Sequence, residues 1–123
     1  LMMKIVYQYD FYPNPELVAQ IKNFLGLQES LEEEDRALLM TRAQDICSKI
    51  EEIDGKISGF STDWSISRMS RVDLSIIRLA AYEILFDDSV ETPLAINEAV
   101  ELAKQYGGED SPAFVNGILA RFA

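Results

Sequence analysis

A predominantly apolar stretch at residues 70–86, SRVDLSIIRLAAYEILF, constrains the fold of this chain more than any other feature of the sequence. Its apolar residues occur around the whole circumference of a helix, and a helix without a wide polar face belongs in a protein interior. Ser70, followed three residues later by Asp73, is a variant of the capping box, in which each side chain can bond the other's backbone N–H. The sequence therefore predicts a buried central helix that begins at Ser70, with the other helices packed around it.

Three helices are predicted before this central one. Apolar residues at helical spacing predict a first helix from residue 1 that stops before Pro13, because a proline disfavours helical geometry in the residue that precedes it. A second helix should begin at Asn14 and end at Gly26, which can supply the usual C-terminal turn. The third and longest helix should run to about Ile53 and be interrupted by Gly55.

The remaining segments add further helical signals. Residues 55–69 predict a short helix and a connector, with Trp64 as a packing anchor rather than a base-stacking platform. Thr92 and Ser111 are each followed by a proline, which predicts a cap and a first helical residue for two more helices, the first of which ends at Gly107. About seven helices without a strand signal predict a single all-α domain, a compact helical bundle over residues 1–123.

The composition argues against an enzyme. The chain has no histidine, and its one cysteine, Cys47, lies in an apolar helical series, where it is expected to be a reduced core residue of an intracellular protein. There is no Gly-rich phosphate loop, nucleophile elbow or Cys/His cluster, so no catalytic site, metal site or cofactor is predicted. The acids at residues 32–35 and 87–91 are interpreted as a solvated helix start and a polar loop. Neither a membrane span nor a leader is expected.

The formal net charge of −10 argues against extensive electrostatic binding of nucleic acid and, taken alone, favours a protein partner. The chain nevertheless opens as LMMKIV, with Leu1 in place of an initiator methionine and no helix cap. We therefore expect that the first helix begins in its middle, and residues upstream would change the local charge.

Three motifs resemble the NusB family of transcription antitermination factors. Residues 93–107, PLAINEAVELAKQYG, followed by residues 108–119, GEDSPAFVNGIL, are similar to the C-terminal signature of that family. The segment RLAAYEIL at residues 78–85 resembles its central helix, and IVYQYD at residues 5–10 resembles the end of its first helix. The resemblance covers the whole chain and is most specific in the last fifty residues.

The resemblance implies a fold and a function. The fold would be two small helical subdomains packed together. The protein would be a cytoplasmic, bacterial RNA-binding adaptor that pairs with the small-subunit ribosomal protein NusE. The pair would bind the boxA element of nascent ribosomal RNA transcripts as single-stranded RNA. The complex would connect to other Nus factors and RNA polymerase, so that transcription passes terminators.

The resemblance also assigns roles to a few residues. Tyr7 and Asp73 correspond to positions at or near the NusE contact, and Glu83 lies on the same helix as Asp73. Asp110 and Phe114 correspond to positions on the RNA side. An aromatic ring at the start of a helix can stack on an unpaired base, and the N–H groups of that helix terminus can bind phosphate.

Alternatives stay open at these positions. Phe114 fits core packing as well as base stacking, Asp110 can be an ordinary acid at a helix start, and Asp73 can act in the capping box. The family's first helix begins with an arginine-rich segment that contacts phosphates, whereas here Lys4 alone stands in that region as an RNA-binding candidate. Loss of those cations should weaken RNA binding and flatten its salt dependence.

Two other functions compete with this one. The same helical domain occurs at the N-terminus of RNA cytosine-5 methyltransferases, where it would be an RNA-recruiting module of an enzyme. That alternative predicts a long continuation with a βαβ region and a catalytic cysteine. The second alternative is a protein-only helical interaction module, which agrees with the acidic net charge of the chain. It predicts dimerisation without an effect on RNA. A homodimer would not exclude the antitermination role, because some family members self-associate.

Overall fold

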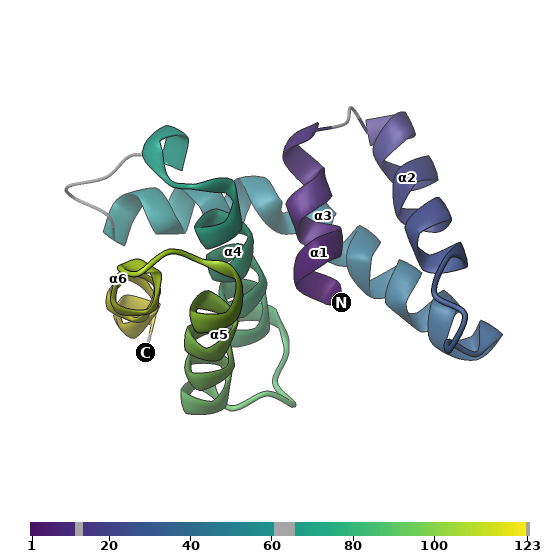
Figure 1. Ribbon diagram of the computed structural model, residues 1–123. Helices are drawn as coiled ribbons and strands as arrows, with labels where there is room; N and C mark the ends of the chain where they lie inside the picture. Colours follow the sequence, from purple (N-terminus) through teal and green to yellow (C-terminus); the bar gives the residue numbers. More distant parts are fainter. Residues whose placement is uncertain (12–13, 61–65, 123) are drawn as a thin grey trace. The chain divides into compact units, whose positions relative to one another are not determined.

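The structure, a computed structural model, describes residues 1–11, 14–60 and 66–122, which contain only helices, turns and bends (Figure 1). The all-α prediction is confirmed, with six α-helices in these residues against about seven expected. None of the described helices is long and apolar enough to cross a membrane. Trp64 lies outside the described residues. The α-helices are α1 (Met2–Tyr7), α2 (Asn14–Gly26), α3 (Glu33–Phe60), α4 (Arg71–Phe86), α5 (Thr92–Tyr106) and α6 (Ser111–Leu119), and the 3-10 helices are η1 (Gln8–Phe11), η2 (Ile66–Arg68) and η3 (Ala120–Phe122).

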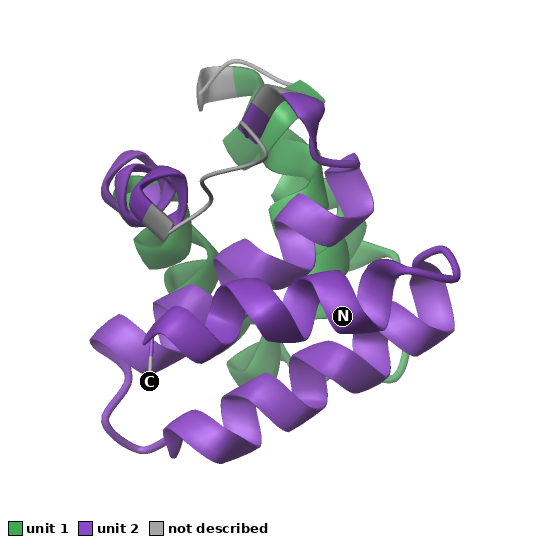
Figure 2. Cartoon of the chain, turned by 90° about the vertical axis from the view of Figure 1, so that its left-hand side faces the viewer, with its two compact units in different colours: residues 1–49 green, residues 50–123 purple. Residues whose placement is uncertain are grey.

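The chain divides into two compact units, residues 1–49 and residues 50–123, and the division falls inside α3 (Figure 2). The first unit has an apolar core to which α1, α2 and α3 all contribute, with Cys47 partly buried against it. The fully buried members of this core are Ile5, Leu17, Ile21, Leu25 and Ala43.

The second unit is built around α4, as the apolar stretch predicted. α4, α5 and α6 pack against one another. Leu74, Ile76 and Ile77 of α4 are completely buried, and Ala80 and Ala81 on the next turn are almost completely buried. Small residues also face the core from α5, where Ala95, Ala99 and Ala103 lie at four-residue intervals and let the helices approach closely.

The prediction that Gly55 interrupts the third helix is wrong, because α3 continues through this glycine to Phe60. Ile53 and Ile57, one turn apart, are both completely buried, so they hold this part of the helix in the core. A glycine inside a helix costs about 1 kcal/mol relative to alanine, which burial of two isoleucines outweighs.

Two other helix boundaries differ in detail from the prediction: the end of the first helix and the start of α5 (Thr92–Tyr106). The first helix tightens into a 3-10 helix at Gln8, shortly before the predicted stop. Thr92 was expected to cap the helix that became α5, but it is the first residue of that helix. Glu91 occupies the cap position and makes no side-chain cap hydrogen bond.

A buried ion pair joins α3 to α4. The guanidinium of Arg78, whose side chain is only 3% exposed, donates from Nε to Oδ1 of Asp54 at 2.9 Å and from Nη2 to Oδ2 at 2.7 Å. A two-bonded arginine–carboxylate pair fixes both the distance and the relative orientation of its two partners. The pair therefore ties the last part of α3 to the middle of the central helix.

We expect Asp54→Asn to lower the free energy of unfolding by about 3 kcal/mol, because it removes the carboxylate charge that pairs with the buried Arg78 guanidinium. The matched control is Lys104→Gln, which breaks the Lys104–Glu101 pair on the exposed surface of α5 and should cost less than about 0.5 kcal/mol. Urea denaturation of the three proteins measures both changes. Equal losses would show that the buried pair contributes no more than a surface pair.

Candidate functional site

The site begins at the N-terminus of α4, where Ser70 caps the helix. Its Oγ accepts a hydrogen bond from the backbone N–H of Asp73 at 3.0 Å, and its extended backbone matches that of a helix N-cap. This confirms the serine half of the predicted capping box. The cap fixes the first turn of α4, from which the side chain of Asp73 projects.

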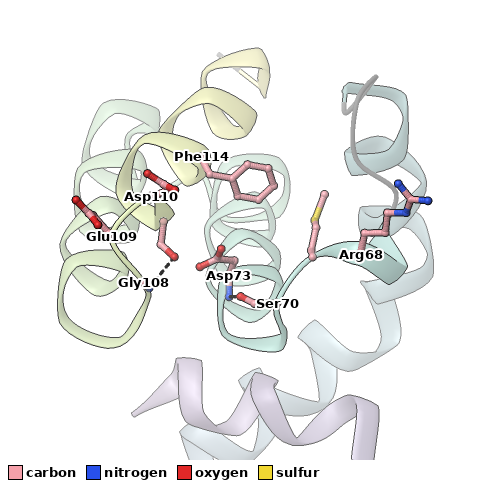
Figure 3. A pocket seen from close by; sticks show the side chains of 9 residues that line it. Arg68, Ser70, Asp73, Gly108, Glu109, Asp110 and Phe114 are labelled. Carbon is pink, nitrogen blue, oxygen red and sulfur yellow. Dashed lines mark hydrogen bonds between the residues drawn. The ribbon is translucent and has the colours of Figure 1, made fainter.

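The turn between α5 and α6 faces this first turn of α4 across a pocket of about 330 Å³ (Figure 3). We call it the α4–α6 pocket. Of the residues predicted from the sequence, it brings together Asp73, Asp110 and Phe114. Its lining comes from the segment before α4, the first turn of α4, the α5–α6 turn and the start of α6: Arg68, Met69, Ser70, Asp73, Gly108, Glu109, Asp110, Ser111 and Phe114.

The charged groups of the pocket are mainly acidic. Asp73, Glu109 and Asp110 supply three carboxylates and Arg68 one guanidinium. The Oδ1 atom of Asp73 is buried and, within the described part of the chain, has no hydrogen-bond partner. A buried acceptor without a partner costs about 1–3 kcal/mol, so a donor brought by a bound molecule would stabilise it. The pocket suits hydrogen-bond donors and cations better than phosphate.

Phe114 lies one turn into α6, and its ring forms part of the pocket wall (Figure 3). The side chain is half-buried: part of it packs against the protein and part borders the pocket, and base stacking stays a prediction. Asp110 occupies the N-cap position of α6, as expected for a helix-start acid, but its side chain makes no cap hydrogen bond and the residue is exposed.

Ser111 does not have the role that the sequence predicted. It is the first residue of α6 instead of its cap, and it is only 7% exposed. Its Oγ accepts a hydrogen bond from the backbone N–H of Gly108 at 2.9 Å. The serine–proline pattern therefore predicted the start of the last helix correctly. The Ser111 hydroxyl, however, closes the turn before α6 instead of capping the helix.

The other predicted site residues lie elsewhere. Lys4 and Tyr7 are exposed on α1, in the first unit. The ring of Tyr7 contacts that of Phe11, with centroids 5.1 Å apart, and Phe11 is 52% exposed. Glu83 belongs to the second unit but lies ten residues along α4 from Asp73, which is about 15 Å. It does not line the pocket.

Sequence reasoning missed three residues that share these surfaces: Arg68, Glu109 and Phe11. Phe11 could have been found, because it is one helical turn from Tyr7 on the same exposed face. Arg68 and Glu109 carried no such signal, since only the fold brings their segments together. No group of three potential metal ligands gathers among the residues that the structure describes.

An all-helical protein of two units, with an acidic, aromatic-walled pocket and no catalytic residues placed together in the part described, has the features of a binding protein. The model of the NusB family matches residues 1–123. The chain belongs to the NusB family, as its motifs predicted. The curated relatives are named transcription antitermination proteins, so the prediction that the chain is not an enzyme is confirmed.

Individual relatives agree with this assignment. The chain is 42% identical to the transcription antitermination protein NusB of Lachnoclostridium phytofermentans, over 98% of this chain and 91% of the relative. It is 45% identical to that of Acetivibrio thermocellus, over 98% of this chain and 82% of the relative. A solved structure of NusB from T. maritima has a TM-score of 0.82 and 34% identity, and covers 99% of this chain and 84% of that one.

We expect Ser70→Ala to lower the free energy of unfolding by about 1 kcal/mol, because the N–H of Asp73 loses its acceptor at the start of α4. The control is Ser48→Ala, the same chemical change at an exposed position inside α3, where alanine is the better helix former and stability should stay equal or rise. Urea denaturation measures both variants. A Ser70→Ala protein as stable as its Ser48→Ala counterpart would contradict the capping role.

Proposed function

We propose that this chain acts as a transcription antitermination factor that pairs with ribosomal protein NusE and binds boxA-type single-stranded RNA of nascent ribosomal transcripts. The pair would help to assemble the antitermination complex with other Nus factors on bacterial RNA polymerase, in the cytoplasm. The observation that carries the proposal is the α4–α6 pocket, which gathers Asp73, Asp110 and Phe114 in a member of the NusB family.

The pocket would contact RNA through a base. Three carboxylates beside one guanidinium repel phosphate, but the bordering Phe114 ring offers a face on which an unpaired base can stack. The exposed Asp110 carboxylate can accept a hydrogen bond from a base amino group or a ribose 2′-hydroxyl. Phe114 and Asp110 therefore act in positioning and reading a base, whereas the phosphates need cations from elsewhere.

Those cations are scarce in this chain. Lys4 is exposed on α1 and is the candidate for a phosphate contact. With a net charge of −10, the chain needs a basic partner for tight RNA binding. A ribosomal protein is such a partner, because it normally binds RNA.

The partner surface would include the exposed pair of Tyr7 and Phe11. Tyrosine in a partly exposed aromatic cluster is typical of residues that contribute most to protein–protein binding. Asp73 would accept a hydrogen bond from the partner, which gives its unpartnered Oδ1 a donor. Glu83 remains a further candidate for the NusE contact. Self-association through the same surface would compete with NusE.

The two competing functions make different predictions. A protein-only module would bind NusE or itself but would show no RNA effect. A methyltransferase recruiting domain would continue into a catalytic region. The curated relatives favour the antitermination role over this second alternative, because they carry the antitermination name and the match spans 91% and 93% of two of them.

We expect Phe114→Ala to weaken boxA RNA binding by the chain with NusE by about 5- to 150-fold, since stacking of one base on an aromatic ring contributes about 1–3 kcal/mol. Phe114→Leu, which keeps most of the apolar packing but has no ring, should lose nearly as much. Fluorescence anisotropy with labelled RNA at several salt concentrations measures both variants.

Lys4→Gln separates the phosphate contact from the base contact in the same titration. It should reduce the slope of log affinity against log salt by about 0.7, whereas the two Phe114 variants should leave this slope unchanged. Wild-type binding equal to that of Phe114→Ala would refute the stacking role. If the wild-type chain with NusE does not bind boxA RNA at all, the RNA function is wrong and the protein-only module replaces it.

We expect Tyr7→Ala to weaken binding of NusE at least tenfold, because it removes an aromatic anchor of the partner surface. The control is Tyr106→Ala on α5, since Tyr106 is exposed to a similar degree, 40% against 36% for Tyr7. Isothermal titration calorimetry with NusE measures the affinities, and circular dichroism checks that both variants fold. Similar affinities for the two variants would remove Tyr7 from the interface.

A further inference from the structure

The turn between α5 and α6 is closed so tightly at Gly107 that no side chain fits there. A Cβ added to Gly107 would lie 2.5 Å from both Cβ and Oγ of Ser111 and 2.8 Å from the backbone oxygen of Ala103. The φ of Gly107 is −93°, which other residues adopt, so its backbone conformation does not require glycine. The requirement is one of space.

Ser111 fills that space from the other side of the turn. Its side chain accepts the N–H of Gly108 at 2.9 Å, and its own backbone N–H donates to the Gly108 oxygen at 3.2 Å. Gly107 in turn ends α5 with a hydrogen bond from its N–H to the Ala103 oxygen at 2.9 Å. The end of α5 and the first residue of α6 are thus held in direct contact.

This contact also sets the position of the pocket wall. Asp110 immediately precedes Ser111, and Phe114 follows it by about one helical turn, so both move with the start of α6. Asp73 on the opposite wall is fixed independently by the Ser70 cap. The distance across the α4–α6 pocket therefore depends on how closely Ser111 approaches Gly107.

We propose that Gly107 is a positioning residue of the α4–α6 pocket: its missing side chain lets Ser111 close the turn and so places Asp110 and Phe114 opposite Asp73. A methyl group at Gly107 would need about 1 Å more room to reach ordinary contact distances. Two of its three close neighbours, Ser111 Cβ and the Ala103 oxygen, cannot swing away as the end of a flexible side chain could. The start of α6 must shift instead.

The consequence for RNA binding rests on the proposed function, but the displacement of α6 does not. We expect Gly107→Ala to weaken boxA RNA binding by the full chain with NusE about tenfold while the protein still folds. Its ¹⁵N–¹H NMR spectrum should show shifted amide signals for Asp110, Ala113 and Phe114. The matched control is Gly55→Ala in α3, where an added Cβ meets nothing within 4 Å; it should bind RNA within twofold of the wild type.

A rescue variant distinguishes positioning from a general loss of stability. Ser111→Gly in the Gly107→Ala background removes two of the three close contacts, so the double variant should bind RNA at least threefold more tightly than Gly107→Ala. A merely destabilised protein would not improve when a second favourable side chain is deleted. Coupling of this sign between two positions is what a direct steric contact produces.

If Gly107→Ala does not fold, Ser111→Ala tests the same contact without a clash, because it removes only the acceptor for the Gly108 N–H. It should shift the amide signals of Gly108, Ala113 and Phe114 and weaken RNA binding about threefold. The proposal is overturned if a folded Gly107→Ala, or failing that Ser111→Ala, shows wild-type amide signals for Ala113 and Phe114. If the wild-type chain binds no RNA, the proposed function fails, and the amide shifts alone decide the role of Gly107.

Discussion

The paired hydrogen bonds between Arg78 and Asp54 are the interaction on which the second unit most depends. They hold a charged side chain that is almost completely buried, and they join α3 to the middle of α4. α5 and α6 then pack on α4, so each later element takes its position from a helix that this pair has already oriented. A purely apolar contact would favour the same burial but would permit more sliding between the helices, because dispersion forces have no direction.

The α4–α6 pocket depends on the same packing, because its two walls belong to α4 and α6. One wall belongs to the first turn of α4, where Ser70 fixes Asp73, and the other to the start of α6, where the close approach of Gly107 and Ser111 fixes Phe114. Both walls are helix termini held by short local contacts, and both helices pack in one core. Local contacts therefore orient the side chains of Asp73 and Phe114, while the packing of α4 and α6 in the core sets the distance between the two pocket walls.

Much of this arrangement could be predicted from sequence, and the failures have identifiable causes. The central helix and its Ser70 cap were correct because apolar periodicity and capping are local signals. The effect of Gly55 was wrong because burial of Ile53 and Ile57 overrides helix propensity. The Arg78–Asp54 pair was not predicted, since its members are 24 residues apart and either could have faced solvent. The gathering of Asp73 with Phe114 in one pocket was not predicted, because no local pattern links these two residues and the family resemblance assigned Asp73 to the partner contact and Phe114 to the RNA side.

An acidic chain can still take part in RNA binding if it leaves the phosphates to other groups. The carboxylates of the α4–α6 pocket oppose phosphate, but they can accept hydrogen bonds from bases, and the Phe114 ring is uncharged. Such a surface gains little from non-specific electrostatic attraction, so its affinity for RNA depends on a basic partner and on the base presented. Under the proposed function, the net charge of −10 would disfavour RNA binding by the chain alone and attract a basic protein. Binding to RNA would then be conditional on formation of the proposed pair.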